Sequence, residues 1–258
     1  MAVEISVLTS SSSGNCTFIS TSRAKILLDA GINPTQAIKR LNSIGESLDK
    51  IDAVVISHEH IDHVSGLSAL LSKKDVPTYI TRDTYEAINP RPACNRLEFI
   101  KSGQPFSIKD LSVCGFSIPH DAVDPLGFNL EAEGIRVGHV TDLGYMTELV
   151  MHRLKCCDVI VLESNHDLEM LKVGPYPWHL KQRIMSRQGH LSNEIVGRFL
   201  EDEFDGKAQY IILAHLSENN NHPDIARMVA AQSLEPRGFD LGNLQVASKS
   251  SPSPLIHL

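Results

Sequence analysis

The stretch AVVISHEHIDH, residues 53–63, joins an apolar run to a cluster of polar side chains. The apolar run predicts a short buried strand, at whose end His58 and His60, two residues apart, extend to one side. Asp62 and His63 follow where the chain turns into a helix, so their side chains diverge by about 100°. Four nitrogen and oxygen donors within six residues are costly at a strand end unless a metal pair compensates their polarity. The stretch therefore predicts a metal site; the alternative is a solvated loop that is rich in histidine.

Further polar residues follow strand-like runs elsewhere in the chain. They are His120 after Val113–Ile118, Asp142 after Arg136–Thr141, and His215 after Tyr210–Leu213. Taken singly, each would be a cap or a hydrogen-bonded core residue. Open sheets present their ligand-binding residues at the ends of strands, so four such strand ends together indicate one site.

The rest of the chain alternates between short strands and helices. The other expected strands are Val3–Leu8, Cys16–Ser20, Lys25–Leu28, Ala53–Ser57, Pro77–Ile80, Arg96–Ile100, Phe106–Ile108, Phe128–Ala132 and Val159–Leu162. The expected helices are Pro34–Ile44 (capped by Asn33), Leu67–Leu71, Met146–Leu154, His179–Ser186, Asn193–Glu203 and Asp224–Gln232. Strands dominate early in each half and helices cover them, which favours an α/β fold, an αββα sandwich of two mixed β-sheets flanked by helices. We expect one domain over residues 1–247 and a flexible tail over 248–258, which is rich in serine and proline.

Composition limits the class of protein. The 258 residues are 42% hydrophobic and 21% charged, as in a soluble globular protein, and no apolar run reaches the ~20 residues of a membrane span. The N-terminus does not read as a signal peptide, and an odd count of five cysteines without a C-x-x-C pair does not predict a disulfide framework, so we expect a cytoplasmic protein. A net charge of −7 argues against broad polyanion binding but permits a local basic groove.

The histidine cluster belongs to a longer series of motifs. HEHIDH has the pattern H-x-H-x-D-H, and Asp29 in LLDAG, His120, Asp142 and His215 follow in order. With these motifs the chain resembles the metallo-β-lactamase superfamily over Leu27–His215. The resemblance implies a first metal held by His58, His60 and His120. It implies a second held by Asp62, His63 and His215, with Asp142 bridging both and Asp29 orienting a ligand histidine or the ligand loop.

The implied ligands are all nitrogen and oxygen donors. This set suits two divalent cations, for which we expect Zn²⁺, with Mn²⁺ as the alternative. Two ions roughly 3.5–4 Å apart would lower the pKa of a bridging water toward 7, so that its hydroxide could serve as nucleophile. Asp62 would orient this hydroxide or accept its proton. Members of the superfamily with a redox di-iron centre carry glutamate at the position of His60, so histidine there favours hydrolysis.

The superfamily acts on β-lactams, thioesters, lactones and phosphodiesters, so the fold does not decide the substrate. The loop TSSSSGN, residues 9–15, can offer Ser12, Ser13, Asn15 and backbone N–H groups to a phosphate, unless it is a plain turn. Residues 170–193 contain no acidic residue but hold several basic ones among aromatic side chains. The basic residues proposed to contact a strand are Lys181, Arg183 and Arg187. The alternative is an amphipathic helix with a solvated basic face.

Three short motifs narrow the resemblance. GHLSN at 189–193 and ESNHD at 163–167, with LTSSSSGN at 8–15, resemble the YycJ/WalJ-type subfamily of bacterial nucleases with this fold. That resemblance alone implies 5′→3′ exonuclease activity on DNA, as single strands or duplex ends, and a link to DNA repair. It makes His190 and His166 candidates for binding the scissile phosphate or protonating the leaving oxygen; each could equally be a cap or turn histidine.

The favoured function is therefore a two-metal phosphodiester hydrolase, a 5′→3′ DNA exonuclease. The alternative hypothesis for an enzyme is a metal-dependent hydrolase of a small ester, lactone, thioester or β-lactam. A third hypothesis is a binding module whose metals are structural. It is disfavoured, because a structural metal site rarely needs open ligand positions. The residues give no indication of oligomeric state.

Overall fold

The computed structural model describes residues 3–258, and within them the strands form two mixed sheets of seven. The first sheet has the order β14 (Ile256–His257), β1 (Glu4–Thr9), β2 (Cys16–Ser20), β3 (Lys25–Leu28), β4 (Ala53–Val55), β5 (Thr78–Thr81), β6 (Leu97–Ile100). The second has the order β13 (Leu244–Val246), β12 (Tyr210–Ala214), β11 (Val159–Glu163), β10 (Ile135–Val140), β9 (Leu126–Ala132), β8 (Leu111–Ser117), β7 (Pro105–Ile108).

Each sheet is part antiparallel and part parallel. In the first, β14 to β3 pair antiparallel and β3 to β6 pair parallel. In the second, β7 to β10 pair antiparallel and β10 to β13 pair parallel. Parallel neighbours end at the same edge of a sheet, so the loops after β3, β4, β10, β11 and β12 emerge together. These loops carry most of the residues discussed below.

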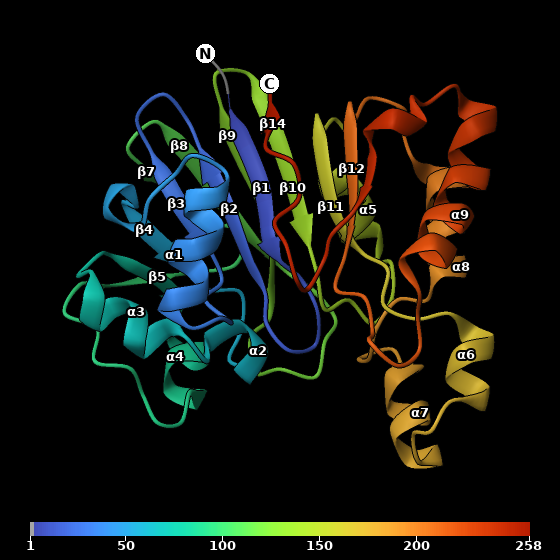
Figure 1. The fold of residues 1–258 in the computed structure, drawn as a ribbon, viewed down its shortest axis with the longest axis horizontal. Helices are drawn as coiled ribbons and strands as arrows, with labels where there is room; N and C mark the ends of the chain where they lie inside the picture. Colours follow the sequence, from blue (N-terminus) through green and yellow to red (C-terminus); the bar gives the residue numbers. More distant parts are fainter. Residues whose placement is uncertain (1–2) are drawn as a thin grey trace.

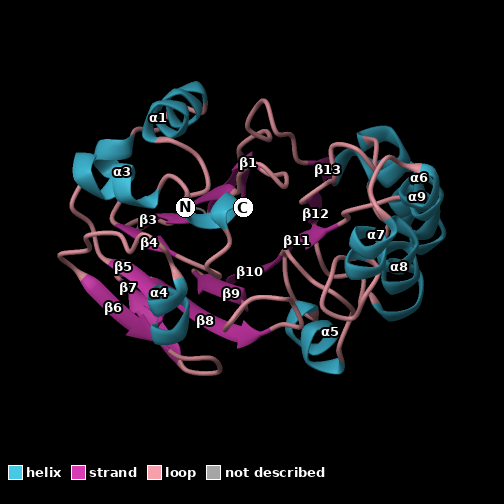
Figure 2. Ribbon diagram, turned by 90° about the horizontal axis from the view of Figure 1, so that it is seen from below, coloured by secondary structure: helices cyan, strands magenta, loops and turns pink. Residues whose placement is uncertain are grey.

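Helices cover the outer face of each sheet (Figures 1 and 2). Those beside the first sheet are α1 (Pro34–Ser43), α2 (Ile61–Val64), α3 (Leu67–Lys73) and α4 (Arg82–Ala87). Those beside the second are α5 (Glu148–Leu154), α6 (Leu168–Val173), α7 (Trp178–Ile184), α8 (Asn193–Arg198) and α9 (Pro223–Leu234). A π-helical turn, Phe199–Glu203, extends α8. Short 3₁₀ turns lie at Leu48–Lys50, Glu235–Arg237 and Leu241–Asn243. None of the helices in the described part of the chain has the length and hydrophobicity needed to cross a bilayer.

The strand sequences explain this layering. In β3, Ile26 and Leu28 join the core between the sheets, whereas Leu27 packs under the helices. In β11, Val161 faces the other sheet and Ile160 faces the helices. Strands that are apolar at every position can bury both faces, so sheets of this kind need a cover on each side. The αββα sandwich expected from the sequence is confirmed.

Residues 248–258 do not form the flexible tail that their composition predicts. β14 pairs with β1, and Ile256 is buried in the core between the sheets. Ser253 accepts a hydrogen bond at Oγ from the backbone N–H of Val7. The compositional argument is wrong here because one buried isoleucine and the open edge of β1 supply the packing and backbone partners that a polar tail otherwise lacks.

Replacing Ile256 with alanine is therefore expected to lower the free energy of unfolding by about 2 kcal/mol or more, because a buried side chain is lost from the core. Urea denaturation measures this change. His257→Ala is the matched control. The side chain of His257 is 61% exposed and pairs with Glu4, so the expected change in the free energy of unfolding is at most ~1 kcal/mol. Equal midpoints for the parent and the Ile256 variant would contradict a packed terminus.

Candidate metal centre

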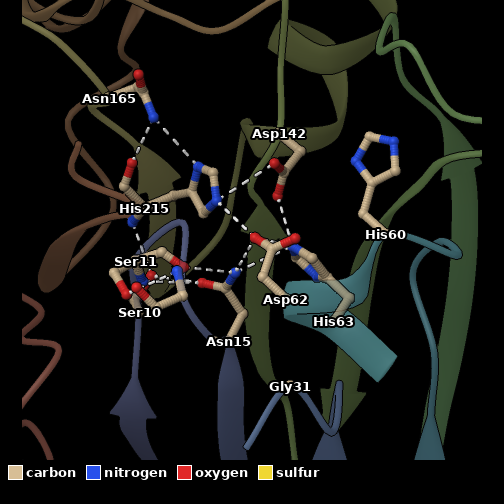
Figure 3. Close-up of polar contacts among 12 residues, drawn as sticks. Ser10, Ser11, Asn15, Gly31, His60, Asp62, His63, Asp142, Asn165 and His215 are labelled. Atoms are coloured by element: carbon tan, nitrogen blue, oxygen red, sulfur yellow. Dashed lines mark hydrogen bonds and ion pairs between the residues drawn. The ribbon is translucent and has the colours of Figure 1, made fainter. Parts of the chain in front are cut away.

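Loops from both sheets bring the histidine and aspartate side chains together (Figure 3). His58 and His60 follow β4, and Asp62 and His63 lie on α2. The others come from the second sheet: His120 follows β8, Asp142 follows β10, and His215 follows β12. The strand-end argument thus locates all seven residues at one place. Their donor atoms form two close groups that have Asp142 between them.

The first group contains His58, His60 and His120, whose donor atoms lie within 4.8 Å of one another. Nε2 of His120 is 3.2 Å from Nδ1 of His60. His58 is buried, and its Nε2 has no hydrogen-bond partner among the described residues, while its Nδ1 lies 3.0 Å from Oγ of Ser57. An unpartnered buried nitrogen costs about 1–3 kcal/mol. A cation at this point would remove that cost.

The second group contains Asp62, His63, Asp142 and His215. Nε2 of His63 lies 3.0 Å from Oδ2 of Asp142, and Nε2 of His215 lies 3.3 Å from Oδ2 of Asp62. Oδ1 of Asp142 is 3.4 Å from Nε2 of His215 and 3.6 Å from Nε2 of His120 in the first group. Asp142 is thus placed to contact ions in both groups.

The electrostatics of the centre suit cations. Burial lowers the pKa of His58 well below its usual value, so this imidazole stays neutral and can offer a lone pair. Burial alone would raise the pKa of Asp142, but His215 and His63 outweigh it and hold the pKa well below the usual range. Burial would lower the pKa of His63 and of His215, but the surrounding carboxylates outweigh it and raise the pKa of both, so a cation that binds here displaces their protons. Deprotonated imidazoles and ionised carboxylates are the donors that divalent metals require. The residues present therefore fit a pair of metal ions.

Asp29 supports the centre from behind. Its Oδ2 accepts a hydrogen bond from Nδ1 of His63 at 2.8 Å and from Oγ of Ser57 at 2.9 Å, and its Oδ1 accepts the backbone N–H of Ser57 at 2.8 Å. Fixing Nδ1 in this way points Nε2 of His63 toward the centre. This is the position in which the sequence expects Asp29.

Glu163, at the end of β11, is a functional candidate that the sequence analysis did not single out. Its buried Oε1 lies 2.8 Å from Nδ1 of His190 and 2.9 Å from Nδ1 of His215. Its Oε2 accepts the backbone N–H groups of Leu143 and Leu191. Burial would raise its pKa, but His190 outweighs that effect and lowers it to about 2. The signal was available: a carboxylate ends the apolar strand VIVLE at the same sheet edge as Asp142 and His215.

The two candidate acid–base histidines lie in different environments. His190 has a side chain 22% exposed, and its Nδ1 is 3.8 Å from Oδ1 of Asp142. His190 also belongs, with Asp142, Glu163 and His215, to a third group of close donor atoms. His166 is buried and lies outside the three groups found among residues 3–258, and burial lowers its pKa to about 4. Its backbone carbonyl accepts the N–H of Asn193 at the start of α8. The structure therefore brings His190, but not His166, among the close donor atoms of the centre, and a chemical role for His166 stays a prediction.

The serine-rich loop reaches the metal centre through Asn15. Asn15 is buried, and its Nδ2 lies 3.1 Å from Oδ2 of Asp62 and 3.0 Å from Nε2 of His63. Ser12 and Ser13 are both exposed, and Ser13 donates to Glu218. The amide of Asn15 therefore contacts two proposed metal ligands, and its role in binding substrate stays a prediction.

Gly31 allows the loop after β3 to approach α2 closely. A Cβ atom at this position would lie 1.6 Å from the backbone oxygen of Asp62, which also accepts the N–H of Asn15 at 2.7 Å. Only glycine leaves room for this contact. The close approach holds the helix turn that carries Asp62 and His63.

The basic segment also differs from its prediction. Lys181 is buried, and its Nζ donates to the backbone carbonyls of Lys172 at 2.7 Å and Gly174 at 2.8 Å, at the end of α6. It satisfies carbonyls that a helix end leaves unpaired, so it does not face a groove. Arg183 is exposed and pairs with Asp121 at 2.5 Å, and Arg187 stacks over the ring of Tyr145 at 4.2 Å.

Three residues of the centre have left-handed backbone conformations. The φ angles are +64° at Asp29, +58° at Asp142 and +56° at His215. Each is the first or second residue after a strand, and the turn directs its side chain toward the centre. Left-handed φ is uncommon for residues other than glycine, and clusters of such residues occur at functional sites.

The chain is similar to known proteins of one superfamily. Residues 24–215 match the family model described as "Beta-lactamase superfamily domain". The chain is 34% identical over 246 residues to Exodeoxyribonuclease YycJ of Bacillus anthracis, covering 94% of this chain and 93% of that protein. It is 31% identical over 242 residues to Exodeoxyribonuclease WalJ of Streptococcus pneumoniae, covering 92% and 90%. Among solved structures, the metallo-beta-lactamase fold protein YhfI from Bacillus subtilis superposes with a TM-score of 0.73 at 17% identity, covering 98% of this chain and 99% of that one.

Proposed function

We propose that this chain, which belongs to the metallo-β-lactamase superfamily, is a metal-dependent phosphodiesterase that degrades DNA from its 5′ end. The observation that carries the proposal is the convergence of seven nitrogen and oxygen donors in two groups joined by Asp142. Its substrate class rests on 34% identity to Exodeoxyribonuclease YycJ across nearly the whole of both chains. We further propose that residues 3–258 are one domain, because β14 completes the first sheet. The cytoplasm suits its unpaired cysteines.

The proposed ligands follow the two groups. His58, His60 and His120 would hold one ion, Asp62, His63 and His215 would hold the other, and Asp142 would contact both. The mixture of imidazole and carboxylate donors favours Zn²⁺, with Mn²⁺ as the alternative. Bound cations would supply a water of lowered pKa and stabilise the charge that develops on the attacked phosphate.

The chain's own residues then handle the protons. In the proposed reaction the water oxygen bonds to phosphorus, the bond from phosphorus to the ester oxygen breaks, and the leaving oxygen takes up a proton. Asp62, whose side chain is 14% exposed, would accept the proton of the water. His190 donates Nδ1–H to Glu163, so its Nε2 is the nitrogen left to give a proton to the leaving oxygen. The proposed strand contacts are Ser12, Ser13, Arg183 and Arg187. Lys181 is not among them, because its Nζ donates to two backbone carbonyls.

The test uses purified protein loaded with Mn²⁺ or Zn²⁺. Single- and double-stranded DNA, labelled at the 5′ or the 3′ end, is incubated beside a chromogenic β-lactam and a simple lactone. The expected result is early release of the 5′ label as a mononucleotide and stepwise shortening of the 3′-labelled strand. Turnover of the lactam or lactone with intact DNA would overturn the nuclease proposal. Release of the 3′ label first would overturn the polarity.

Arg183 and Lys181 give a matched pair of variants. Arg183→Gln is expected to weaken binding of single-stranded DNA and to reduce the slope of log affinity against log salt by about 0.7, the value for one lost phosphate contact. Lys181→Met should leave this slope unchanged and lower stability instead, because two helix-end carbonyls lose their donor. Titrations with phosphorothioate-protected DNA measure both slopes. If the Arg183 variant kept the parental slope, this residue would not contact phosphate.

A further inference from the structure

A pocket opens directly beside the metal centre. Its lining residues are Ser12, Asp121, Asn165, Tyr176, Leu180, Arg183, Ile184, Gly189, His190 and Ser217. We infer that this pocket binds the unpaired base of the terminal nucleotide, so that the enzyme acts on single-stranded or frayed ends. The inference rests on the proposed function, which it deepens by selecting one kind of DNA end.

The lining of the pocket combines apolar and polar side chains. Leu180 and Ile184 come from α7 and are half-buried, so they offer apolar surface to a flat ligand. Asn165 and Ser217 also line the pocket. The amide nitrogen of Asn165 donates to the backbone carbonyl of His215, and Oγ of Ser217 accepts the backbone N–H of Asn220, so the Asn165 oxygen can accept from a ligand and the Ser217 hydroxyl can donate to one. A nucleobase has this same division, with apolar faces and a polar edge. Base pockets in nucleic-acid enzymes combine stacking with hydrogen bonds to that edge.

Tyr176 is held in place as a stacking surface. It lies in the sequence GPYPW between α6 and α7, where Pro175 and Pro177 restrict the backbone on both sides. Its Oη accepts a hydrogen bond from Nδ2 of Asn219 at 3.0 Å, which fixes the ring from the far end. A ring that is already fixed loses little conformational entropy when a base stacks on it.

The pocket is joined rigidly to the centre through Gly189. A Cβ atom there would lie 2.1 Å from the backbone oxygen of Ile184, and that oxygen accepts the N–H of His190 at 2.9 Å. Glycine therefore lets the loop that carries His190 touch α7. A base against α7 would place its sugar and phosphate beside His190 and the metal ligands.

Charge and size agree with this ligand. The carboxylate of Asp121 would repel a phosphate, but Arg183 contacts its Oδ2 through two nitrogens at 2.5 Å and neutralises it. The pocket volume of about 190 Å³ lies below the roughly 300–1,000 Å³ of pockets for drug-sized molecules. It suits one base and excludes a base pair. The terminal base must therefore leave its partner before it enters.

The first test measures binding alone. Metal-loaded protein is titrated with 2-aminopurine deoxyribonucleoside 5′-monophosphate, whose fluorescence falls when the base stacks. Quenching is expected with the parent and with Tyr176→Phe, which keeps the ring. Tyr176→Ala should weaken affinity at least about fivefold, because stacking on an aromatic side chain is lost. Phe99→Ala, an aromatic deletion on the distant β6, is the control. Equal affinity and quenching in the parent and Tyr176→Ala would overturn the inference.

The second test separates this inference from the proposed function. The parent is given single-stranded DNA whose 5′-terminal nucleotide either carries its base or is abasic. A ratio of kcat/KM of about five or more in favour of the base is expected, falling toward one in Tyr176→Ala. Equal cleavage of both substrates by the parent would overturn the base pocket and leave the nuclease intact. Cleavage of neither, with nucleotide binding retained, would overturn the nuclease and leave a nucleotide site.

Discussion

Replacing Asp142 with asparagine is expected to lower the metal content of the protein and to reduce DNA hydrolysis by at least about 1,000-fold. This side chain contacts His63 and His215 in one group and approaches His120 in the other, so one substitution weakens both proposed ions. Loss of a single electrostatic group at an active site already costs roughly 100- to 1,000-fold. The measurements are elemental analysis of the dialysed protein and the rate of nucleotide release.

Asp224→Asn serves as the control, because this aspartate has a side chain 91% exposed at the start of α9, outside the groups of donor atoms. It is expected to keep the parental metal content and rate. An asparagine variant at Asp142 that retained two ions per chain and full turnover would refute the bridging role. Asp142→Ala is expected to give the same loss, which excludes an effect peculiar to the amide.

Glu163→Gln is expected to lower kcat about 100-fold and to weaken metal binding about 10- to 100-fold, the usual cost of removing a group that orients a metal ligand. The carboxylate accepts from four donors: two histidine nitrogens and the backbone N–H groups of Leu143 and Leu191. Glutamine presents one acceptor oxygen and one N–H₂ group, so two of these donors would face another donor. Both His190 and His215 lose their fixed orientation.

The kinetic pattern distinguishes this positioning role from general destabilisation. Glu163→Gln should lower kcat while KM for DNA stays near the parental value, because the base pocket and the exposed Arg183 are intact. Glu163→Asp should recover part of kcat, since it retains the charge. Glu169→Gln, with a side chain 78% exposed on α6, is the control. Equal loss of kcat in both Glu163 variants together with a raised KM would indicate a disturbed fold instead.

The sequence allowed much of the fold to be predicted, for a local reason. Apolar runs such as VIVLE, and the polar residues at their ends, are recognised in the sequence without knowing which segments pack against them in the fold. Strand ends in parallel sheets meet at one edge, so the sequence alone predicts that the donor residues lie together.

The remaining features depend on contacts between distant segments. The strand-end pattern marks Glu163, but its contacts with His190 and His215 depend on β11 lying between β10 and β12, an order that no local pattern gives. The burial of Lys181 depends on the end of α6, and the terminal strand β14 pairs with β1 from the other end of the chain. Composition and helical periodicity therefore predicted the wrong environment for both.

The left-handed turns at Asp29, Asp142 and His215 lower the stability of the protein while they position residues that its activity needs. A non-glycine residue in this conformation costs roughly 1–3 kcal/mol. Aspartate tolerates it better than histidine, because its short polar side chain can hydrogen-bond locally. Glycine at any of the three positions would relieve the backbone while deleting a donor or its support. Directed evolution for heat resistance alone would thus drift toward glycine there and yield a hardier, inert protein, so such a selection needs a simultaneous screen for catalysis.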